Sequence, residues 1–422
     1  MNLIQTQIRE GTILGKLESG VCRFSAIPYA QAPVGSLRWC APQPAHWRGT
    51  LDATRPGPVS PQLPSRLRGA MGDFEAEQSE DCLHLTVWTP AVDQRRRPVV
   101  VWLHGGAWQS GAGALDWYSG AYLAARGDVV VVAPNYRLAA LGWLYVPGET
   151  ANVGLLDQEA ALAWTRENIE SFGGDPEQIT VMGQSAGGTN IACLMTRKPV
   201  FQRAILQSAS LGRGIRSAAQ AERLSQVLLQ AAGVRNLAQA RQLPWQDWLK
   251  AQTAPEVAQA LQAEGGRRSL FAPVADGEVL ALDVEQQLQT QASAQMDVLL
   301  GYTAHEMRAF PGMPAGSQGD LLGNQVFGAP TRAWAQRAVA SGRKAWLYRF
   351  DVAPSAQFGA CHCIELPFVF DTLPSFAHAP MLEGLPAEKG RALVQEMQGA
   401  WLDFIHGRPL PWPLAPEMKC FD

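Results

Sequence analysis

One short segment of the chain combines the residue types that nucleophilic chemistry requires. Ser185 stands at the centre of the pattern G-Q-S-A-G at 183–187. The short segment 178–180 before it is typical of a strand, and residues 189–195 after it are typical of a helix. A serine in a strained turn between strand and helix holds its hydroxyl clear of the sheet, and the flanking glycines remove side chains that would collide there. The pattern therefore predicts a serine nucleophile.

A second glycine-containing segment could stabilise negative charge beside that serine. An oxyanion hole needs two or three backbone N–H groups that converge on one point. Ala186 follows the serine directly and would supply one of these groups. Gly105 and Gly106 would supply the others, because a loop without side chains can approach a substrate carbonyl closely. We therefore expect Gly105, Gly106 and Ala186 to form an oxyanion hole.

Several longer patterns predict the elements that position these loops. The continuous apolar run 99–103 is typical of a strand that is buried on both faces, and 128–134 is expected to form a second buried strand. Further strands are expected at 79–88, 202–208, 295–301 and 344–350, and helices at about 155–172 and 386–406, the last of which would end the chain. Strands that alternate with helices favour an α/β fold with a mostly parallel sheet and right-handed crossovers.

Composition limits the possible settings and partners. Of 422 residues, 47% are hydrophobic and 17% charged, which is typical of a globular protein with a sizeable core. The net charge of −3 gives no reason to expect a nucleic-acid partner. Seven scattered cysteines favour reduced thiols and a cytoplasmic location. The N-terminal residues show no signal-peptide pattern, and no apolar stretch is long enough to predict a membrane span.

Taken together, the motifs resemble those of the type-B carboxylesterase family of the α/β-hydrolase fold. That family includes the bacterial para-nitrobenzyl esterases and the cholinesterases. The matching segments lie at 27–30, 79–83, 104–107, 135–137, 152–158, 171–176 and 183–188. The resemblance implies a single α/β-hydrolase domain over 1–422, with a mostly parallel central sheet flanked by helices. Helices would be added after the nucleophile strand at about 215–265, and a shortened helical segment at about 305–340 would separate the acid from the histidine.

The base of a serine hydrolase of this fold follows the nucleophile and the acid in the chain. The histidines after Ser185 are His305, His362, His378 and His406. Only the surroundings of His362 match the histidine loop of the resembled family. The resemblance therefore assigns the general base to His362.

The acid should follow a strand between the serine and the histidine. Glu306 comes five residues after Gly301, at the end of a predicted strand, and occupies the position of the family's acidic residue. Asp276 and Asp297 remain alternatives by position, although Asp276 has the setting of a turn and Asp297 begins a strand. We expect the triad Ser185, Glu306 and His362.

The resemblance also suggests supporting roles for residues outside the triad. Ser208 resembles a serine that lies behind the triad. Arg38 with Glu80, and Arg137 with Asp157, resemble ion pairs that tie loops to the sheet.

Two departures from the family pattern are visible. Gln184 precedes the nucleophile where the family usually has Glu. Ser60 stands where secreted relatives have a cysteine that bonds to the one matching Cys82, so no disulfide is expected there.

These observations predict a serine carboxylic-ester hydrolase that acts on a small-molecule ester through an acyl-enzyme. No cofactor is expected, since Cys361 and Cys363 beside His362 would make a poor zinc site without a second ligand cluster. An amidase or carbamate hydrolase would use the same machinery and stays open. A catalytically silent binding homologue is a further alternative, although such relatives usually lose a triad member.

Overall fold

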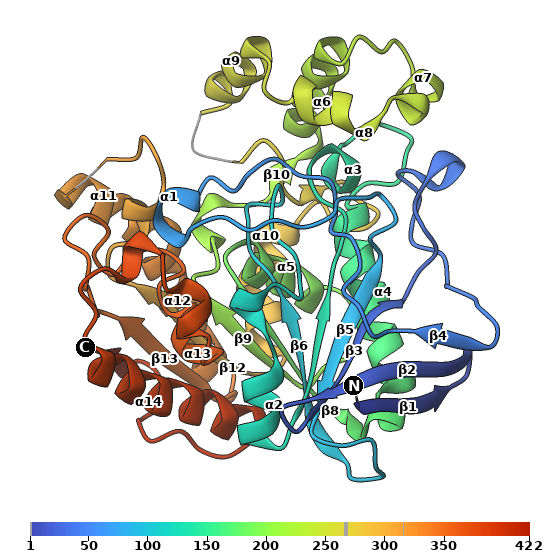
Figure 1. Ribbon diagram of the computed structural model, residues 1–422. Helices are drawn as coiled ribbons and strands as arrows, with labels where there is room; N and C mark the ends of the chain where they lie inside the picture. The colour runs from blue at the N-terminus through green and yellow to red at the C-terminus, as the bar shows by residue number, and fades with distance from the viewer. Residues whose placement is uncertain (1, 266–268, 315) are drawn as a thin grey trace.

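The computed structural model describes residues 2–265, 269–314 and 316–422, and among these a twelve-stranded sheet forms the centre of the molecule (Figure 1). The strand order is β1-β2-β3-β5-β7-β6-β8-β9-β12-β13-β14, and β4 pairs with β2. The bounds are Asn2–Ile8 (β1), Gly11–Glu18 (β2), Val21–Pro28 (β3), Thr50–Asp52 (β4), His84–Thr89 (β5), Arg97–Leu103 (β6), Val130–Pro134 (β7), Gly174–Gln184 (β8), Arg203–Gln207 (β9), Asp297–Thr303 (β12), Ala345–Phe350 (β13) and Met418–Phe421 (β14). A separate two-stranded sheet pairs β10 (Arg216–Ser217) with β11 (Val274–Ala275).

The two halves of the main sheet differ in strand direction. From β7 through β6, β8, β9, β12 and β13 to β14, every neighbouring pair is parallel. From β1 through β2, β3 and β5 to β7, the neighbouring pairs are antiparallel. Parallel strands bring their carboxyl ends to one edge of a sheet, where ligands bind in open α/β folds. The predicted nucleophile and acid follow β8 and β12, so both lie at that edge.

The continuous apolar run of β6 is explained by burial on both faces. Val99, Val101 and Leu103 belong to one hydrophobic core, whereas Val100 and Trp102 belong to the other. Because side chains alternate across a strand, a strand covered on both sides needs apolar residues at every position.

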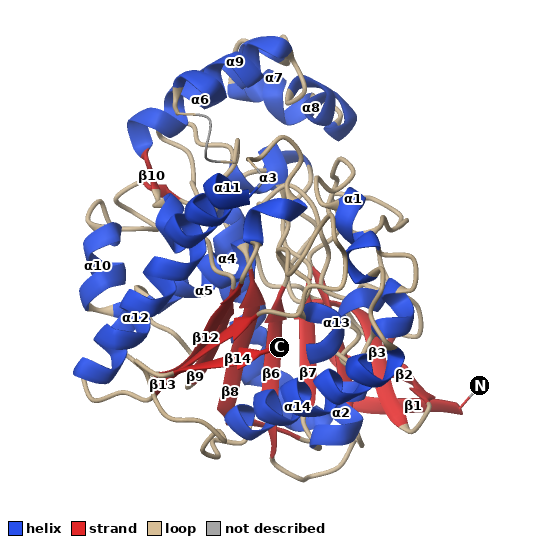
Figure 2. Cartoon of the chain, turned by 90° about the vertical axis from the view of Figure 1, so that its left-hand side faces the viewer, coloured by secondary structure: helices blue, strands red, loops and turns tan. Residues whose placement is uncertain are grey.

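Helices cover both faces of the sheet (Figure 2). Residues of α2, α13 and α14 contribute to one core, and residues of α4, α5 and α12 contribute to the other. The helix bounds are Arg68–Met71 (α1), Ala121–Gly127 (α2), Ala139–Trp143 (α3), Val153–Asn168 (α4), Ala186–Met195 (α5), Ala218–Ala231 (α6), Leu237–Gln242 (α7), Trp245–Ala251 (α8), Pro255–Ala263 (α9), Val284–Thr290 (α10), Gly316–Gly323 (α11), Ala329–Ala340 (α12), Leu366–Val369 (α13) and Ala387–Ile405 (α14).

Two groups of helices lie outside the alternating strand and helix pattern. Helices α6 to α9 gather at one end of the molecule, beyond the sheet (Figures 1 and 2). The second group runs from η6 (Glu306–Ala309) through α11 to the π-helical turn η7 (Asn324–Gly328), and it leads into α12, which packs on the sheet. Residue 315, inside this second group, lies outside the described residues.

The structure corrects two of the element predictions. The segment 79–83 is not part of a strand, because Ser79 Oγ and Glu80 O accept bonds from the N–H groups of Asp81 and Cys82 and form turns, so β5 begins only at His84. The helix expected at 386–406 does not end the chain. It is followed by β14, which pairs in parallel with β13 after a proline-containing loop.

The predicted ion pairs and the absence of a disulfide are confirmed. Arg38 Nε donates to Glu80 Oε2 at 2.8 Å, and Arg137 Nη2 donates to Asp157 Oδ1 at 2.7 Å. All seven cysteines lie within the described ranges and are free thiols. None of the helices in the described residues is both long and apolar enough to span a membrane.

Candidate active site

Ser185 lies in a strained turn between β8 and α5. Its φ of +55° is in the left-handed region that non-glycine residues rarely adopt. A Cβ on Gly187 would lie 2.0 Å from Leu103 O, so this turn can approach β6 only with glycine at that position. Ser185 is partly exposed while its neighbours on both sides are buried. The turn therefore presents the serine hydroxyl at the carboxyl edge of the sheet, as the sequence pattern predicts.

The glycine loop after β6 has a backbone that only glycine tolerates at one position. Gly106 has a φ of +117°, and a Cβ there would lie 1.9 Å from Ser110 O. Its own carbonyl accepts a bond from Ser110 N at 3.1 Å. Within the described part of the chain, the N–H groups of Gly105, Gly106 and Ala186 donate to no other residue. These three groups are available to a ligand.

His104 packs against the glycine loop, and its imidazole is neutral. Its ring stacks on Tyr136 with the centroids 4.3 Å apart, and Nδ1 donates to Gly105 O at 2.7 Å. Tyr136 Oη donates to His104 O at 2.6 Å. Burial lowers the pKa of His104 to about 4, so the imidazole carries no charge at neutral pH.

Glu306 begins η6, directly after β12, and its carboxylate is held by three donors. Oε1 accepts bonds from Thr303 N at 2.8 Å and from Ser208 Oγ at 2.7 Å. Oε2 forms a short hydrogen bond with His362 Nδ1. The side chain is 1% exposed, so these donors replace water around the carboxylate. Ser208 thus lies behind Glu306, on the side away from His362 Nδ1.

His362 is fully buried and is bonded at both ring nitrogens. The bond from Nδ1 to Glu306 places a proton on Nδ1 and leaves Nε2 as an acceptor. Gln184 Nε2 donates to His362 Nε2 at 3.1 Å. Among the described residues no hydrogen bond joins Ser185 to His362 in this arrangement. The structure therefore brings Glu306 and His362 together beside the strained turn that carries Ser185, here called the serine elbow, and Gln184 occupies the lone pair of His362 Nε2.

The aromatic rings of Phe310 and Phe327 cover the same histidine. Their centroids lie 5.1 Å and 4.9 Å from the centroid of the His362 ring. Both phenylalanines also line the cavity above Ser185. Their contacts limit the positions that the imidazole ring can take.

A second buried carboxyl close to Glu306 and His362 was not singled out from the sequence. Glu365 is completely buried, and its Oε1 accepts a bond from Gln207 Nε2 at 3.2 Å. Its Oε2 has no partner among the described residues. Burial, with a smaller contribution from the charge of Glu306, raises the pKa of Glu365 to about 8. The only sequence signal is its position three residues after His362, which does not predict this environment.

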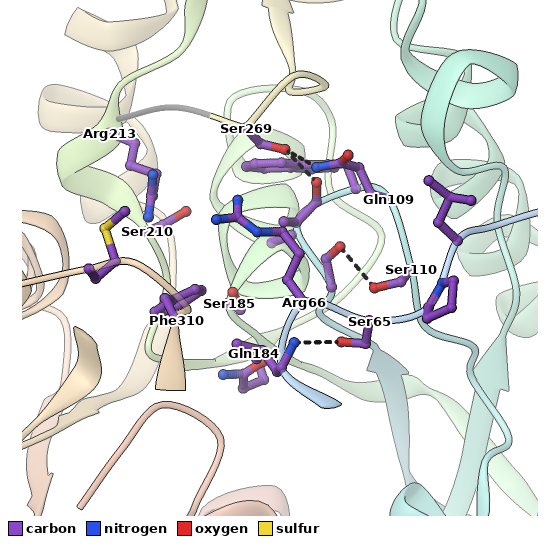
Figure 3. A pocket seen from close by; sticks show the side chains of 18 of the residues that line it. Ser65, Arg66, Gln109, Ser110, Gln184, Ser185, Ser210, Arg213, Ser269 and Phe310 are labelled. Carbon is purple, nitrogen blue, oxygen red and sulfur yellow. Dashed lines mark hydrogen bonds between the residues drawn. The ribbon is translucent and has the colours of Figure 1, made fainter. Parts of the chain in front are cut away.

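A cavity of about 310 Å³ opens above Ser185 (Figure 3). Ser185, Ala186 and Gly106 contribute to its wall, whereas Gly105, Glu306 and His362 do not. The remaining walls come from the loop before α1, the glycine loop, the segment after β9, the end of α8, Ser269 before β11 and the turns around η6 and η7. Ser185 and two of the three expected oxyanion donors thus face one space, while Glu306 and His362 lie beneath it.

The alternative acids and bases lie elsewhere. Asp276 accepts bonds from Val279 N and Leu280 N, and Asp297 accepts one from Lys344 N. These contacts close turns and loops.

Each of the other histidines also has a different setting. His305 Nδ1 accepts a bond from Ala360 N at 3.1 Å, His406 Nε2 donates to Gly127 O at 2.7 Å, and His378 is exposed. Within the described ranges, no group of three or more His, Cys, Asp or Glu side chains is arranged to hold a metal ion.

Comparison with known proteins agrees with this architecture. The sequence model of the carboxylesterase family matches residues 2–318. A probable N-octanoylanthranilate hydrolase of Rhodococcus erythropolis is 37% identical, over 96% of this chain and 93% of its own length. The para-nitrobenzyl esterase of Bacillus subtilis is 34% identical over 96% of this chain and 91% of its own. A solved structure of a PNB esterase superposes with a TM-score of 0.88 at 32% identity, over 99% of this chain and 95% of that one.

A mixed sheet flanked by helices, with a serine elbow at the carboxyl edge, defines an α/β-hydrolase fold. Within that fold the chain belongs to the carboxylesterase family and is a carboxylic ester hydrolase.

Proposed function

We propose that this protein hydrolyses small carboxylic esters through an acyl-enzyme formed on Ser185, with His362 as general base and Glu306 as the acid of the triad. The observation that supports this most strongly is the buried contact between His362 and Glu306 directly beside the elbow. A buried imidazole that is oriented by a carboxylate is the arrangement that activates a serine hydroxyl.

In the first step, Ser185 Oγ attacks the ester carbonyl while His362 Nε2 accepts its proton. Glu306 keeps Nδ1–H oriented and stabilises the imidazolium that forms. The same imidazolium then protonates the leaving alcohol, and a water molecule releases the acyl group by the reverse transfers. Ser208 Oγ and Thr303 N hold the Glu306 carboxylate in place throughout.

Gln184 must give up its hydrogen bond to His362 during this catalytic cycle. Its amide now donates to the lone pair of His362 Nε2 that would accept the serine proton. The bond from Gln184 is therefore replaced by one from Ser185 Oγ before attack. The two donors adjoin in the chain, so the exchange is local.

The negative charge of the tetrahedral intermediate would be held by backbone N–H groups. Gly105, Gly106 and Ala186 are proposed as its donors, because their N–H groups have no competing acceptor among the described residues. Ala186 also begins α5, whose N-terminus favours negative charge. Loss of one such donor would cost about 3 kcal/mol of transition-state stabilisation.

The test is hydrolysis of a short-chain para-nitrophenyl ester by wild type and by Ser185→Ala, combined with labelling by a serine-reactive phosphonate. We expect the variant to lose hydrolysis and the wild type to form an adduct at Ser185. Wild-type rates in Ser185→Ala would exclude this nucleophile. A folded wild type without adduct and without hydrolysis would favour a silent binding homologue.

Amide hydrolysis is a second candidate, favoured by one specific observation. One of the relatives is named for hydrolysis of an N-octanoyl compound, in which nitrogen carries the acyl group. The same triad and oxyanion groups serve both reactions. Esters and amides with the same acyl group and matched leaving groups should be compared. A higher kcat/KM for the amide would reassign the principal activity without changing the catalytic residues.

A further inference from the structure

Two arginines from separate segments meet at the cavity above Ser185. Arg66 belongs to the loop that precedes α1, and Arg213 ends the short helix η4 (Leu211–Arg213), which follows β9. In Figure 3 the side chain of Arg66 extends toward that of Arg213 over the space in which Ser185 lies. Repulsion from the Arg66 charge acts on Arg213, which agrees with this closeness.

The charge of the cavity is one-sided. No Asp or Glu is present among the described residues that line it, whereas Arg66 and Arg213 both are. Burial, together with the neighbouring Arg66, lowers the pKa of Arg213 to about 10, so both guanidinium groups are still charged at neutral pH. Two like charges in a partly desolvated wall raise the free energy of the empty site, and an anion placed between them would lower it.

The backbone that carries Arg213 is held firmly in relation to the catalytic histidine. A Cβ on Gly212 would lie 2.1 Å from Gln325 O, so η4 packs directly against η7. Phe327 of η7 in turn contacts the ring of His362. An anion bound by Arg213 would therefore have a defined position relative to the reacting atoms, as a specificity contact requires.

The rest of the wall is mostly apolar and can hold a short carbon chain. Its larger apolar side chains are Leu63, Leu67, Trp108, Phe310, Met313 and Phe327. This combination favours a ligand with an apolar body and one charged end.

We propose, on the basis of the function proposed above, that the cavity selects esters that carry a carboxylate group, which Arg66 and Arg213 bind while Ser185 attacks the ester carbonyl. The planar guanidinium matches a carboxylate with paired hydrogen bonds. Arg213, which is partly buried, contributes more to this binding than the exposed Arg66, whose charge is more strongly screened by salt.

The test compares charged and neutral substrates of the same shape. In the acyl arm, the mono-para-nitrophenyl ester of glutaric acid is compared with its methyl-capped diester. In the alcohol arm, para-butanoyloxybenzoate is compared with its methyl ester. We expect the charged member of at least one pair to have the higher kcat/KM. We also expect this preference to fall as salt is raised.

Arg213→Met should lower the ratio of charged to neutral kcat/KM about tenfold or more, and Arg66→Met should lower it less. Arg213→Lys should keep part of the preference, because it keeps the charge but loses the paired hydrogen bonds. Arg68→Met is the matched control, since Arg68 is an exposed arginine of the same segment that does not line the cavity. It should leave the ratio unchanged.

A preference for the neutral member in both pairs, or a ratio that neither Arg66→Met nor Arg213→Met changes, would overturn the anion site. Each variant is first labelled with the phosphonate, which reports a folded nucleophile without using either ester. If Arg213→Met fails this check, Arg66→Met and the salt dependence of the wild type still decide. Failure of wild type to form the adduct or to hydrolyse any ester would instead overturn the proposed function.

Discussion

Two buried glutamates lie near the same histidine, and their surroundings give them different charges. Glu306 accepts three hydrogen bonds, from Thr303 N, Ser208 Oγ and His362 Nδ1. Glu365 accepts one from Gln207, and its second oxygen is buried without a partner among the described residues. The first arrangement stabilises a carboxylate, and the second favours the protonated acid.

The difference shows that burial alone does not decide the charge of an acid. Both side chains are almost completely removed from water. What separates them is the number of donors that replace the lost water, together with the charge that Glu306 itself places near Glu365. Glu306, whose carboxylate accepts three hydrogen bonds, can therefore orient His362. Glu365 is neutral at pH 7.

Replacement of the charged acid should have the largest effect. We expect Glu306→Gln to lower kcat by about 10⁴-fold, because an amide cannot hold Nδ1–H and stabilise the imidazolium as a carboxylate does. The measurement is steady-state hydrolysis of a para-nitrophenyl ester at pH 7.

Glu365→Gln is the matched control for that variant. It replaces a neutral acid by a neutral amide of the same shape, so we expect a loss of no more than about tenfold. Equal losses of kcat in the two variants would contradict the conclusion that Glu306 is charged and Glu365 is neutral.

The stability of the fold should fall between pH 6.5 and pH 8 because of Glu365. Its pKa is about 8 in the folded protein against an ordinary 4.5, so the folded state keeps a proton that the unfolded state releases. The contribution is complete below pH 4.5 and declines by about 1.4 kcal/mol per pH unit until pH 8. His104, with its lowered pKa, acts in the opposite direction, but only below its ordinary value of 6.5.

Urea unfolding of wild type and Glu365→Gln across this range is the measurement. We expect wild type to lose about 2 kcal/mol more than the variant between pH 6.5 and pH 8. Parallel stability curves would show that Glu365 is ionised in the folded protein.

The smallest effect is expected when one hydrogen-bond donor to Glu306 is removed. Ser208→Ala removes the hydrogen bond to Oε1 and leaves the one from Thr303 N. We expect kcat to fall about tenfold with little change in KM, because the acid is less well oriented but the cavity is unchanged.

Ser293→Ala is a suitable control for this deletion, since Ser293 is also buried and bonds to a backbone carbonyl away from the site. A loss in KM alone for Ser208→Ala would contradict a positioning role for that serine.

Local sequence patterns were sufficient to predict much of the architecture and the serine elbow. Strands β6 and β7 could be predicted because burial on both faces demands an unbroken apolar run. The elbow could be predicted because its glycines have no substitute at such close backbone contacts. Strand β14 could not, because it is four residues long and exists through its pairing with β13, from a distant part of the chain.

For the site, the sequence by itself determined which residue types were present: a serine between glycines, an acid after a strand and a histidine in a family-like loop. Only the tertiary structure decided that Glu306 contacts His362, that Gln184 occupies Nε2, that Glu365 lacks donors and that Arg66 and Arg213 share a cavity. The physical reason is that elbow geometry depends on neighbours in the chain. Charge state and cavity chemistry depend instead on which distant groups replace water around each side chain.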